Sequence, residues 1–224
     1  MMSNFKAERE NMIESQIRPN AVTQGDLLKA MLGTPRELFV PPSQRSLAYM
    51  DGALRVEAAR DGQPARYLLS PMVFAKLVQL AEVKATDKVL DVGAATGYST
   101  AILARLAREV VALECDAGLA ALAKDALSAQ GIENARVIAG PLQEGLRAES
   151  PFDVIFLNGR LGCEPEALFS QLSAGGRLVA IMGEETVSKA QLFRNIDSKI
   201  QRVMAFDAAA PLLPGFEPRQ LFAF

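Results

Sequence analysis

The sequence predicts an α/β fold with a doubly wound, mostly parallel seven-stranded sheet, a C-terminal antiparallel hairpin and an N-terminal extension of helices and a hairpin. Three observations predict this class. From about residue 86 to 183, short apolar runs alternate with helical patterns, which is typical of a parallel sheet covered on both faces. After Gly183 the pattern changes to two strands around a tight turn. The first 70 residues follow neither pattern.

The N-terminal extension, residues 1–70, is expected to pack on the core as a substrate arm. Its helical segments have the apolar spacing of amphipathic helices, and its hairpin has Asp61-Gly62 at the tip. The predicted elements are helices over 5–17 and 24–33, a proline-bracketed turn over 35–42 and a hairpin over 53–71.

The core, residues 71–224, is expected to form a single compact unit. Its first helix, over 72–83, follows Ser70-Pro71, a capping residue before a proline at the first helical position. The predicted parallel strands are 88–93, 109–114, 135–140, 152–159 and 176–183. The predicted helices between them are 98–107, 117–131 and 164–173.

Two further strands, 189–196 and 199–206, flank Asp197-Ser198 and predict an antiparallel hairpin that closes the sheet. Residues 211–224 are expected to be a loop with a short apolar end.

Composition excludes several functions. The 224 residues carry a net charge of −2, with a pI of about 5.4, so no global basic surface indicates a nucleic-acid partner. The sequence has no apolar run long enough to span a bilayer, and its N-terminus has no signal-peptide pattern. We therefore expect a cytoplasmic protein without a membrane partner. The oligomeric state cannot be predicted.

The chain contains no histidine, which excludes His-based triads, His metal ligands and a His general base. Its two cysteines, Cys115 and Cys163, have neither metal-site nor disulfide-framework spacing and are expected to be reduced thiols. No metal site is predicted.

The stretch "VLDVGAATGYSTAILA", residues 89–104, predicts a buried strand, a glycine turn and the start of a helix. This arrangement allows the backbone to approach a ligand at the helix N-terminus. Gly93 and Gly97 do not have the spacing of a dinucleotide fingerprint. They fit the looser acidic-x-Gly-x-x-x-Gly pattern of S-adenosylmethionine (SAM) sites.

Two carboxylates support this assignment. Asp91, two residues before Gly93, would repel a pyrophosphate but suits the ammonium and sulfonium groups of SAM. Glu114 ends the next strand, where an acid can accept both ribose hydroxyls. The alternative is a tight turn beside a solvated strand end. The predicted SAM-binding residues are Asp91, Gly93, Ala94, Ala95, Gly97, Tyr98, Glu114, Cys115, Pro141, Leu142 and Asn158.

Some of these residues allow two interpretations. Tyr98 either stacks on the cofactor or packs under the loop. Asn158 is either a polar group on the acceptor side or a turn residue before Gly159. Cys115 is interpreted as a small apolar wall near the adenine. The methyl group of Ala95, where the usual pattern has glycine, restricts backbone approach.

The sequence resembles the protein-L-isoaspartate O-methyltransferase family over nearly its whole length. The resemblance rests on the stretch from Pro35 to Asp51, "PRELFVPPSQRSLAYMD", on the loop at 89–104, and on the strands that follow it. It implies a SAM-dependent methyltransferase fold with an N-terminal extension. It also implies protein repair, in which methylation of an isoaspartyl carboxylate lets a damaged peptide rearrange through a succinimide.

Three stretches depart from the family pattern. The family's T-I-S-Q-P is "YLLSP" here, so alignment on Pro71 places the family's serine at Leu69, and a shift of one residue places it at Ser70. The family's G-D-G, whose aspartate helps to hold the adenine amine, is Gly140-Pro141-Leu142. The family's C-terminal R-F-V-P-L is "AAPLLPG".

The expected reaction is an in-line methyl transfer to a peptide or protein carboxylate, which needs alignment but no base. Ser70 is the candidate catalytic hydroxyl that orients the acceptor, and a helix N-cap is its alternative role. Two other functions stay open. One is a SAM-dependent methyltransferase with a different acceptor, and the other is a SAM- or S-adenosylhomocysteine-binding protein without repair activity.

Overall fold

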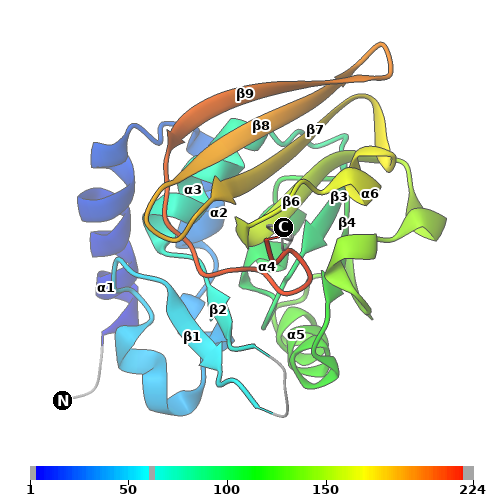
Figure 1. The fold of residues 1–224 in the computed structure, drawn as a ribbon. Coiled ribbons are helices and arrows are strands. Elements are labelled where there is room, and N and C mark those ends of the chain that lie inside the picture. Colours follow the sequence, from blue (N-terminus) through cyan, green and yellow to red (C-terminus); the bar gives the residue numbers. More distant parts are fainter. Residues whose placement is uncertain (1–3, 61–63, 219–224) are drawn as a thin grey trace.

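The computed structural model describes residues 4–60 and 64–218. Seven strands form one sheet in the order β5-β4-β3-β6-β7-β8-β9 (Figure 1). Pairing is parallel from β5 to β7 and antiparallel from β7 to β9, which confirms the predicted fold class. The strands are β3 (Lys88–Val92), β4 (Glu109–Glu114), β5 (Ala135–Ala139), β6 (Phe152–Leu161), β7 (Leu172–Gly183), β8 (Ser188–Ile196) and β9 (Lys199–Asp207).

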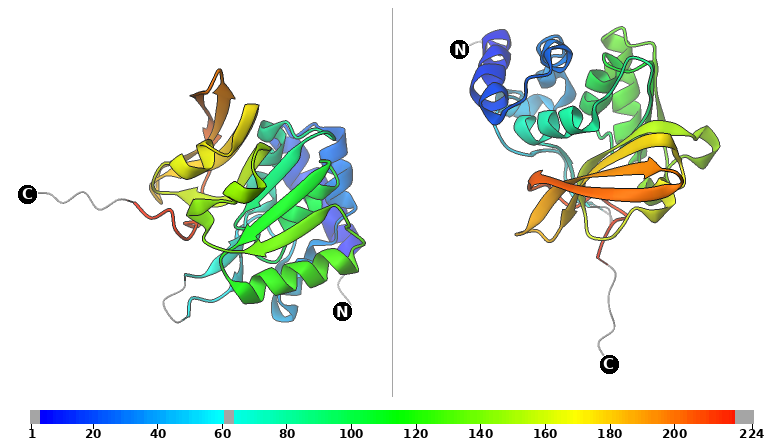
Figure 2. Two further views of the ribbon diagram at one scale, coloured as in Figure 1. Left: turned by 90° about the vertical axis from the view of Figure 1, so that its right-hand side faces the viewer. Right: turned by 90° about the horizontal axis from the view of Figure 1, so that it is seen from above.

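Successive residues of the central strands face opposite sides of the sheet, so each strand contributes to two apolar layers. Val89 and Val154 pack with the layer formed by three helices, whereas Leu90 and Ile155 pack with α6 (Glu166–Phe169) and the C-terminal segment. The three helices are α3 (Pro71–Ala81), α4 (Tyr98–Ala104) and α5 (Ala117–Ala129). Figure 2 shows the twist of the sheet, with β8 and β9 turned away from β4 and β5.

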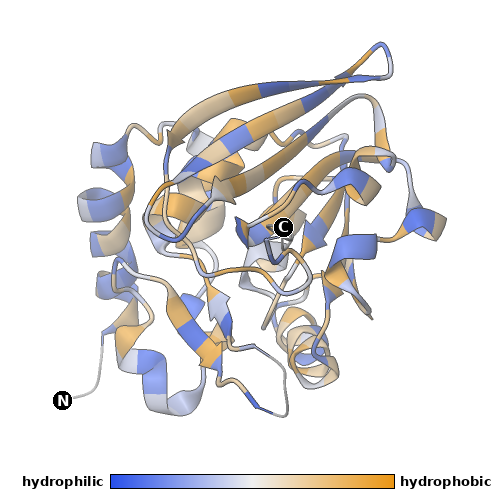
Figure 3. Cartoon of the chain, viewed as in Figure 1, coloured by the Kyte–Doolittle hydropathy of each residue, from blue (hydrophilic) through white to orange (hydrophobic). Residues whose placement is uncertain are grey.

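The N-terminal extension lies on the α3 side of the sheet (Figures 1 and 2). Helix α1 (Phe5–Met12), continued by a π-helical turn (Ile13–Ile17), and α2 (Gly25–Leu32) bury their apolar side chains in the same cluster as α3. Hydrophilic residues cover the outer side of α1 (Figure 3). The extension therefore shares a core with the sheet.

The described part of the extension also contains three 3₁₀ turns and the predicted hairpin. The turns are Arg18–Asn20, Arg36–Phe39 and Pro42–Leu47. Strands β1 (Leu54–Glu57) and β2 (Arg66–Leu68) pair antiparallel in a two-stranded sheet of their own. The predicted tip at Asp61-Gly62 lies outside the described residues, as does the apolar end over 219–224.

One helix prediction is wrong in extent. The helix expected over 164–173 is the single turn Glu166–Phe169, because the chain from residue 171 onward joins the sheet. The amide of Phe152 donates to the carbonyl of Gln171 at 2.9 Å, and Leu172 pairs with Phe152 at the start of β7. The buried side chain of Gln171 bonds to the carbonyl of Glu144 at 2.7 Å.

Candidate functional site

The glycine loop joins β3 to α4 at the carboxyl end of the sheet. Gly93, Ala95 and Gly97 have positive φ angles of 76°, 50° and 90°. A Cβ at Gly97 would lie 3.1 Å from the Cβ of Ala123, so close packing on α5 favours glycine there. Ala95 adopts the left-handed conformation despite its methyl group, which costs about 1–2 kcal/mol.

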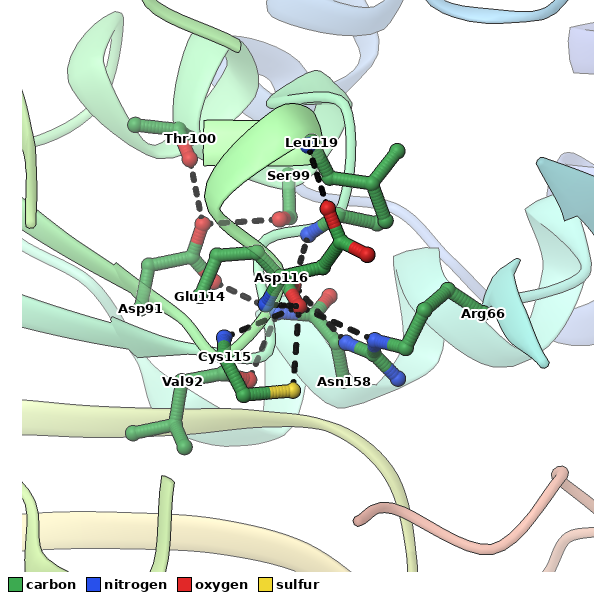
Figure 4. Close-up of polar contacts among 11 residues, drawn as sticks. Arg66, Asp91, Val92, Ser99, Thr100, Glu114, Cys115, Asp116, Leu119 and Asn158 are labelled. Atoms are coloured by element: carbon green, nitrogen blue, oxygen red, sulfur yellow. Dashed lines mark hydrogen bonds and ion pairs between the residues drawn. The ribbon is translucent and has the colours of Figure 1, made fainter. Parts of the chain in front are cut away.

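Asp91 lies under this loop and is completely buried. Its Oδ2 accepts from the hydroxyls of Ser99 and Thr100 at 2.7 and 2.6 Å, and its Oδ1 accepts from the amide of Asn158 at 2.6 Å (Figure 4). Burial raises the pKa of Asp91 to about 6, although these three hydrogen bonds act to lower it and the charge of Glu114 acts to raise it. Asp91 therefore fastens the loop to the start of α4 and to β6.

Asn158 lies inside β6, so the interpretation as a turn residue before Gly159 is wrong. Its amide also donates to the carbonyl of Val92 at 3.1 Å. The strand continues to Leu161 because Arg160 and Leu161 pair with β7, and the amide of Arg160 also donates to the carbonyl of Pro211 at 2.9 Å. Asn158 thus joins the ends of β3 and β6.

Glu114, at the end of β4, is also completely buried, and both its carboxylate oxygens are bonded. Arg66 of β2 forms a bidentate pair with it, Nε to Oε1 at 3.0 Å and Nη2 to Oε2 at 2.9 Å (Figure 4). The amide of Ala95 donates to Oε2 at 2.7 Å, and the amides of Cys115 and Asp116 donate to Oε1 at 3.0 and 3.1 Å. Burial raises the pKa of Glu114, but Arg66 and these amides outweigh burial, so the net pKa is lowered.

The residue types around the loop suit SAM, but their arrangement leaves almost no room for it. The cavity between the loop, Leu69 and Asn158 measures about 10 Å³, whereas small-molecule sites typically measure about 300–1,000 Å³. A Cβ at Gly93 would lie 2.6 Å from Cδ1 of Leu213 and 3.1 Å from Nη2 of Arg66, so these two side chains cover the glycine.

Tyr98 packs under the loop. Its ring is 2% exposed, contacts Phe39 and Phe74 with centroids 5.7 and 5.6 Å apart, and has the guanidinium of Arg36 4.6 Å from its centroid. Cys115 is half-buried with Sγ 3.3 Å from Glu114 Oε1, and burial, followed by the charge of Glu114, raises the pKa of the thiol to about 11. Such a thiol is a poor nucleophile at neutral pH, consistent with a passive wall.

The remaining predicted residues lie near the end of β4. Gly140 donates to the carbonyl of Glu114 at 3.0 Å, Pro141 is exposed, and Leu142 is buried in the apolar layer that also contains Leu213. Ala94 is buried, and its amide donates to the carbonyl of Leu113 at 3.2 Å.

Ser70 and Leu69 lie on different cavities. The Oγ of Ser70 accepts from the amide of Val73 at 3.4 Å, which confirms the N-cap. Ser70 also lines a groove of about 930 Å³ between the β1–β2 hairpin, α3 and the segment after β9. Leu69 is buried and lines the small cavity beside Gly93 and Asn158.

Sequence reasoning missed three side chains at this site: Arg66, Arg160 and Leu213. Arg160 is 8% exposed and lines the groove; its Nη1 donates to the carbonyl of Gly183 at 2.9 Å, while its Nε has no hydrogen-bond partner among the described residues. Arg66 had a detectable signal, because it shares the inward face of β2 with the apolar Leu68 and an inward arginine implies a buried partner. Leu213 follows a loop without periodicity and gave no signal.

Neither a metal centre nor a membrane span is found in the part of the chain that the structure describes. No group of three or more His, Cys, Asp or Glu residues among 4–60 and 64–218 could hold a metal ion. Within those same ranges, no helix is both long and apolar enough to cross a membrane.

Comparisons with known proteins agree on one family. A model of the family described as protein-L-isoaspartate(D-aspartate) O-methyltransferase matches residues 7–209. A protein-L-isoaspartate O-methyltransferase from Koribacter versatilis is 34% identical over 220 residues, which cover 97% of this chain and 96% of the relative. One from Roseiflexus castenholzii is 36% identical over 180 residues, covering 80% and 79% of the two chains.

Solved structures show the same fold. A protein-L-isoaspartate O-methyltransferase superposes with a TM-score of 0.79 at 26% identity, over 94% of this chain and 67% of the other. A Plasmodium falciparum protein described as a beta-aspartate methyltransferase, in complex with S-adenosyl-L-homocysteine, has a TM-score of 0.75 at 19% identity, over 94% and 98%.

Proposed function

The chain belongs to the protein-L-isoaspartate O-methyltransferase family, and we propose that it transfers a methyl group from SAM to the carboxylate of an isoaspartyl peptide or protein. The observation that carries this proposal is the family match over residues 7–209, which includes the extension, the glycine loop and the hairpin after it. SAM is the cofactor of this family, and when bound it supplies an electrophilic methyl group.

The site residues support transfer to an anionic acceptor. An ionised carboxylate needs alignment and removal of water but no general base, in agreement with a chain that has no histidine. The groove beside Ser70 has the size for a peptide segment. Ser70 is positioned there by the start of α3, and its hydroxyl is the candidate group to orient the acceptor in one register, with position 69 as the other.

Arg160 gives the groove a cation for a substrate carboxylate. Its guanidinium is nine-tenths buried with Nε unbonded among the described residues, and an unpaired buried donor is costly until a ligand satisfies it. A bidentate guanidinium–carboxylate contact would fix the peptide relative to Ser70.

The test is methyl transfer from radiolabelled SAM to an isoaspartyl peptide, with the aspartyl peptide of identical sequence as control. We expect base-labile methyl ester on the isoaspartyl peptide alone. Equal labelling of both peptides, or none, would contradict the proposed acceptor.

A second candidate function is binding of SAM or S-adenosylhomocysteine without repair activity. The buried Leu69, which offers no hydroxyl to an acceptor beside Gly93 and Asn158, favours it. Calorimetry with S-adenosylhomocysteine, alongside the peptide assay, separates the two functions: binding without ester formation supports the second.

A further inference from the structure

Arg66 occupies the carboxylate of Glu114, where the ribose of SAM is expected to bind. Arg66 lies 48 residues before Glu114 in sequence and contacts both oxygens of the carboxylate that is expected to accept the ribose hydroxyls. We infer, resting on the proposed function, that Arg66 determines cofactor access: Arg66 and the ribose exclude each other at Glu114, and the Arg66 side chain must withdraw from Glu114 before SAM binds.

The hydrogen-bond capacity of Glu114 supports mutual exclusion. A carboxylate offers about four lone-pair sites. Glu114 already accepts two bonds from Arg66 and three from the amides of Ala95, Cys115 and Asp116. The three amides belong to the loop and to the start of α5, so they remain when a cofactor binds. Only the two bonds from Arg66 can be exchanged for two ribose hydroxyls.

The hairpin that carries Arg66 packs its apolar side chains, Leu54, Val56 and Leu68, into the same buried cluster as α3 and α4, and Arg66 adds a polar attachment to it. Strands β1 and β2 pair only with each other and do not join the seven-stranded sheet. An isolated two-stranded hairpin is marginally stable by itself. Its attachment near the end of β4 includes two arginines: buried Arg66 on Glu114 and exposed Arg60, whose Nη2 lies 3.5 Å from Oδ2 of Asp116.

Movement of Arg66 also affects the groove proposed for the peptide. Its neighbours Ala65 and Tyr67 line the large groove, and Tyr67 lines the small cavity at the loop as well. Withdrawal of the Arg66 side chain therefore affects residues that line the groove proposed for the peptide.

The experiment measures binding of S-adenosylhomocysteine by calorimetry to the wild type, Arg66→Gln and Arg66→Ala. The matched control is Arg55→Ala, since Arg55 is an exposed arginine on the same hairpin. We expect both Arg66 variants to bind at least tenfold more tightly than the wild type, and the control to bind as the wild type does. Unchanged or weaker affinity in folded Arg66 variants would overturn the inference.

Amide hydrogen exchange on the wild type gives a second readout that does not depend on the variants folding. Adding S-adenosylhomocysteine at a saturating concentration should accelerate exchange in β1 and β2 while slowing it in the loop at 93–97. Slower or unchanged exchange in the hairpin, or no binding by any of the proteins, contradicts the inference. Tighter binding by the Arg66 variants without isoaspartyl methylation leaves the inference standing and refutes the proposed function.

Discussion

At the residue scale, the site contains two buried carboxylates whose pKa values are shifted in opposite directions. Glu114 faces an arginine, and its net pKa is lowered. Asp91 has only neutral donors, so burial dominates and raises its pKa to about 6. The difference comes from the charge of the partner, since both groups are completely inaccessible to solvent.

Asp91 should make folding stability depend on pH. Its folded pKa of about 6 exceeds the ordinary value of 3.8, so its contribution is fully present below about pH 4 and is lost as the pH rises through 6. This loss amounts to about 3 kcal/mol. Asp91→Asn removes the titrating group and keeps its size.

The free energy of unfolding of Asp91→Asn, relative to the wild type, should therefore increase by up to about 3 kcal/mol between pH 4 and 8. Urea denaturation across this range measures the difference, with the exposed change Asp125→Asn as the charge-matched control. A constant difference between wild type and Asp91→Asn would contradict the raised pKa.

Leu69 and Ser70 predict weak methylation of isoaspartyl peptides. Leu69 lines the cavity beside Gly93 and Asn158, where it offers no hydrogen bond to an acceptor. Leu69→Ser adds a hydroxyl there, and Leu69→Ala creates a comparable cavity without one. We expect kcat/KM for an isoaspartyl peptide to be about 10- to 100-fold higher for Leu69→Ser than for Leu69→Ala.

The assay needs a temperature at which both variants stay folded, because truncating a buried leucine costs about 2–5 kcal/mol. Ser70→Ala tests the alternative register. Loss of activity in Ser70→Ala with an intact fold, together with equal activity of the two Leu69 variants, would identify Ser70 as the orienting hydroxyl.

Sequence reasoning located Asp91 and Glu114 because each ends a buried strand of a regular pattern. It did not predict their partners. Ser99 and Thr100 follow Asp91 closely in sequence, but Arg66 reaches Glu114 from a separate hairpin. Such a contact depends on tertiary packing of the extension, which local periodicity does not encode.

At the scale of elements, the strands of the central sheet were predictable because they are short, apolar and bounded by turns. The helix at 164–173 was overextended, because Leu168 and Leu172 have helical spacing while Leu172 pairs in the sheet. Sheet pairing overrode the local pattern there. The sequence predicts the β8–β9 hairpin from the two-residue turn Asp197-Ser198, and the observed turn has the backbone conformation that such hairpins require.

Asp197 and Ser198 have φ angles of 50° and 62°, as in the type I′ turns that match the twist of a hairpin. A non-glycine residue in this conformation is strained by about 1–2 kcal/mol. Ser198 is exposed, so replacement by glycine loses little packing. We expect Ser198→Gly to raise the free energy of unfolding by about 0.5–1 kcal/mol.

Ser128→Gly is the matched control, since Ser128 is an exposed residue of helix α5. Glycine in a helix is unfavourable, so this change should lower the free energy of unfolding by about 0.5 kcal/mol. Urea titration of both variants checks the signs. Destabilisation by Ser198→Gly would show that the left-handed conformation is not the source of strain.

At the scale of the whole molecule, the extension is part of the core and not an appendage. Met12, Ile17 and Phe39 belong to the same buried cluster as Phe74 of α3 and Tyr98 of α4. The sequence predicted an arm packed on the core, but composition and periodicity could not show how much apolar surface the two parts share.

Arg36 strengthens this junction. It is 1% exposed, its Nε and Nη2 donate to the carbonyls of Ala48 and Leu69 at 2.8 Å each, and its guanidinium lies against the ring of Tyr98. Burial lowers its pKa, which the nearby tyrosines partly offset. A charged group so placed ties residues 36–48 to the strand that precedes α3.

Residues 71–224 are therefore expected not to fold cooperatively without residues 1–70. Removal of the extension exposes Phe74, Leu77 and Tyr98 to water, at a cost of about 1.5–3 kcal/mol for each large apolar side chain. The three losses together come to about 4.5–9 kcal/mol, which is comparable with the total stability of about 5–15 kcal/mol expected for a domain. The fragment should bind a hydrophobic dye, keep its far-UV circular dichroism and lose its near-UV signal, whereas the full chain unfolds in one urea transition.

A cooperative transition of the fragment, with its near-UV signal intact, would instead mean that the sheet and helices α3 to α5 fold independently and that the extension acts only as an arm over the site.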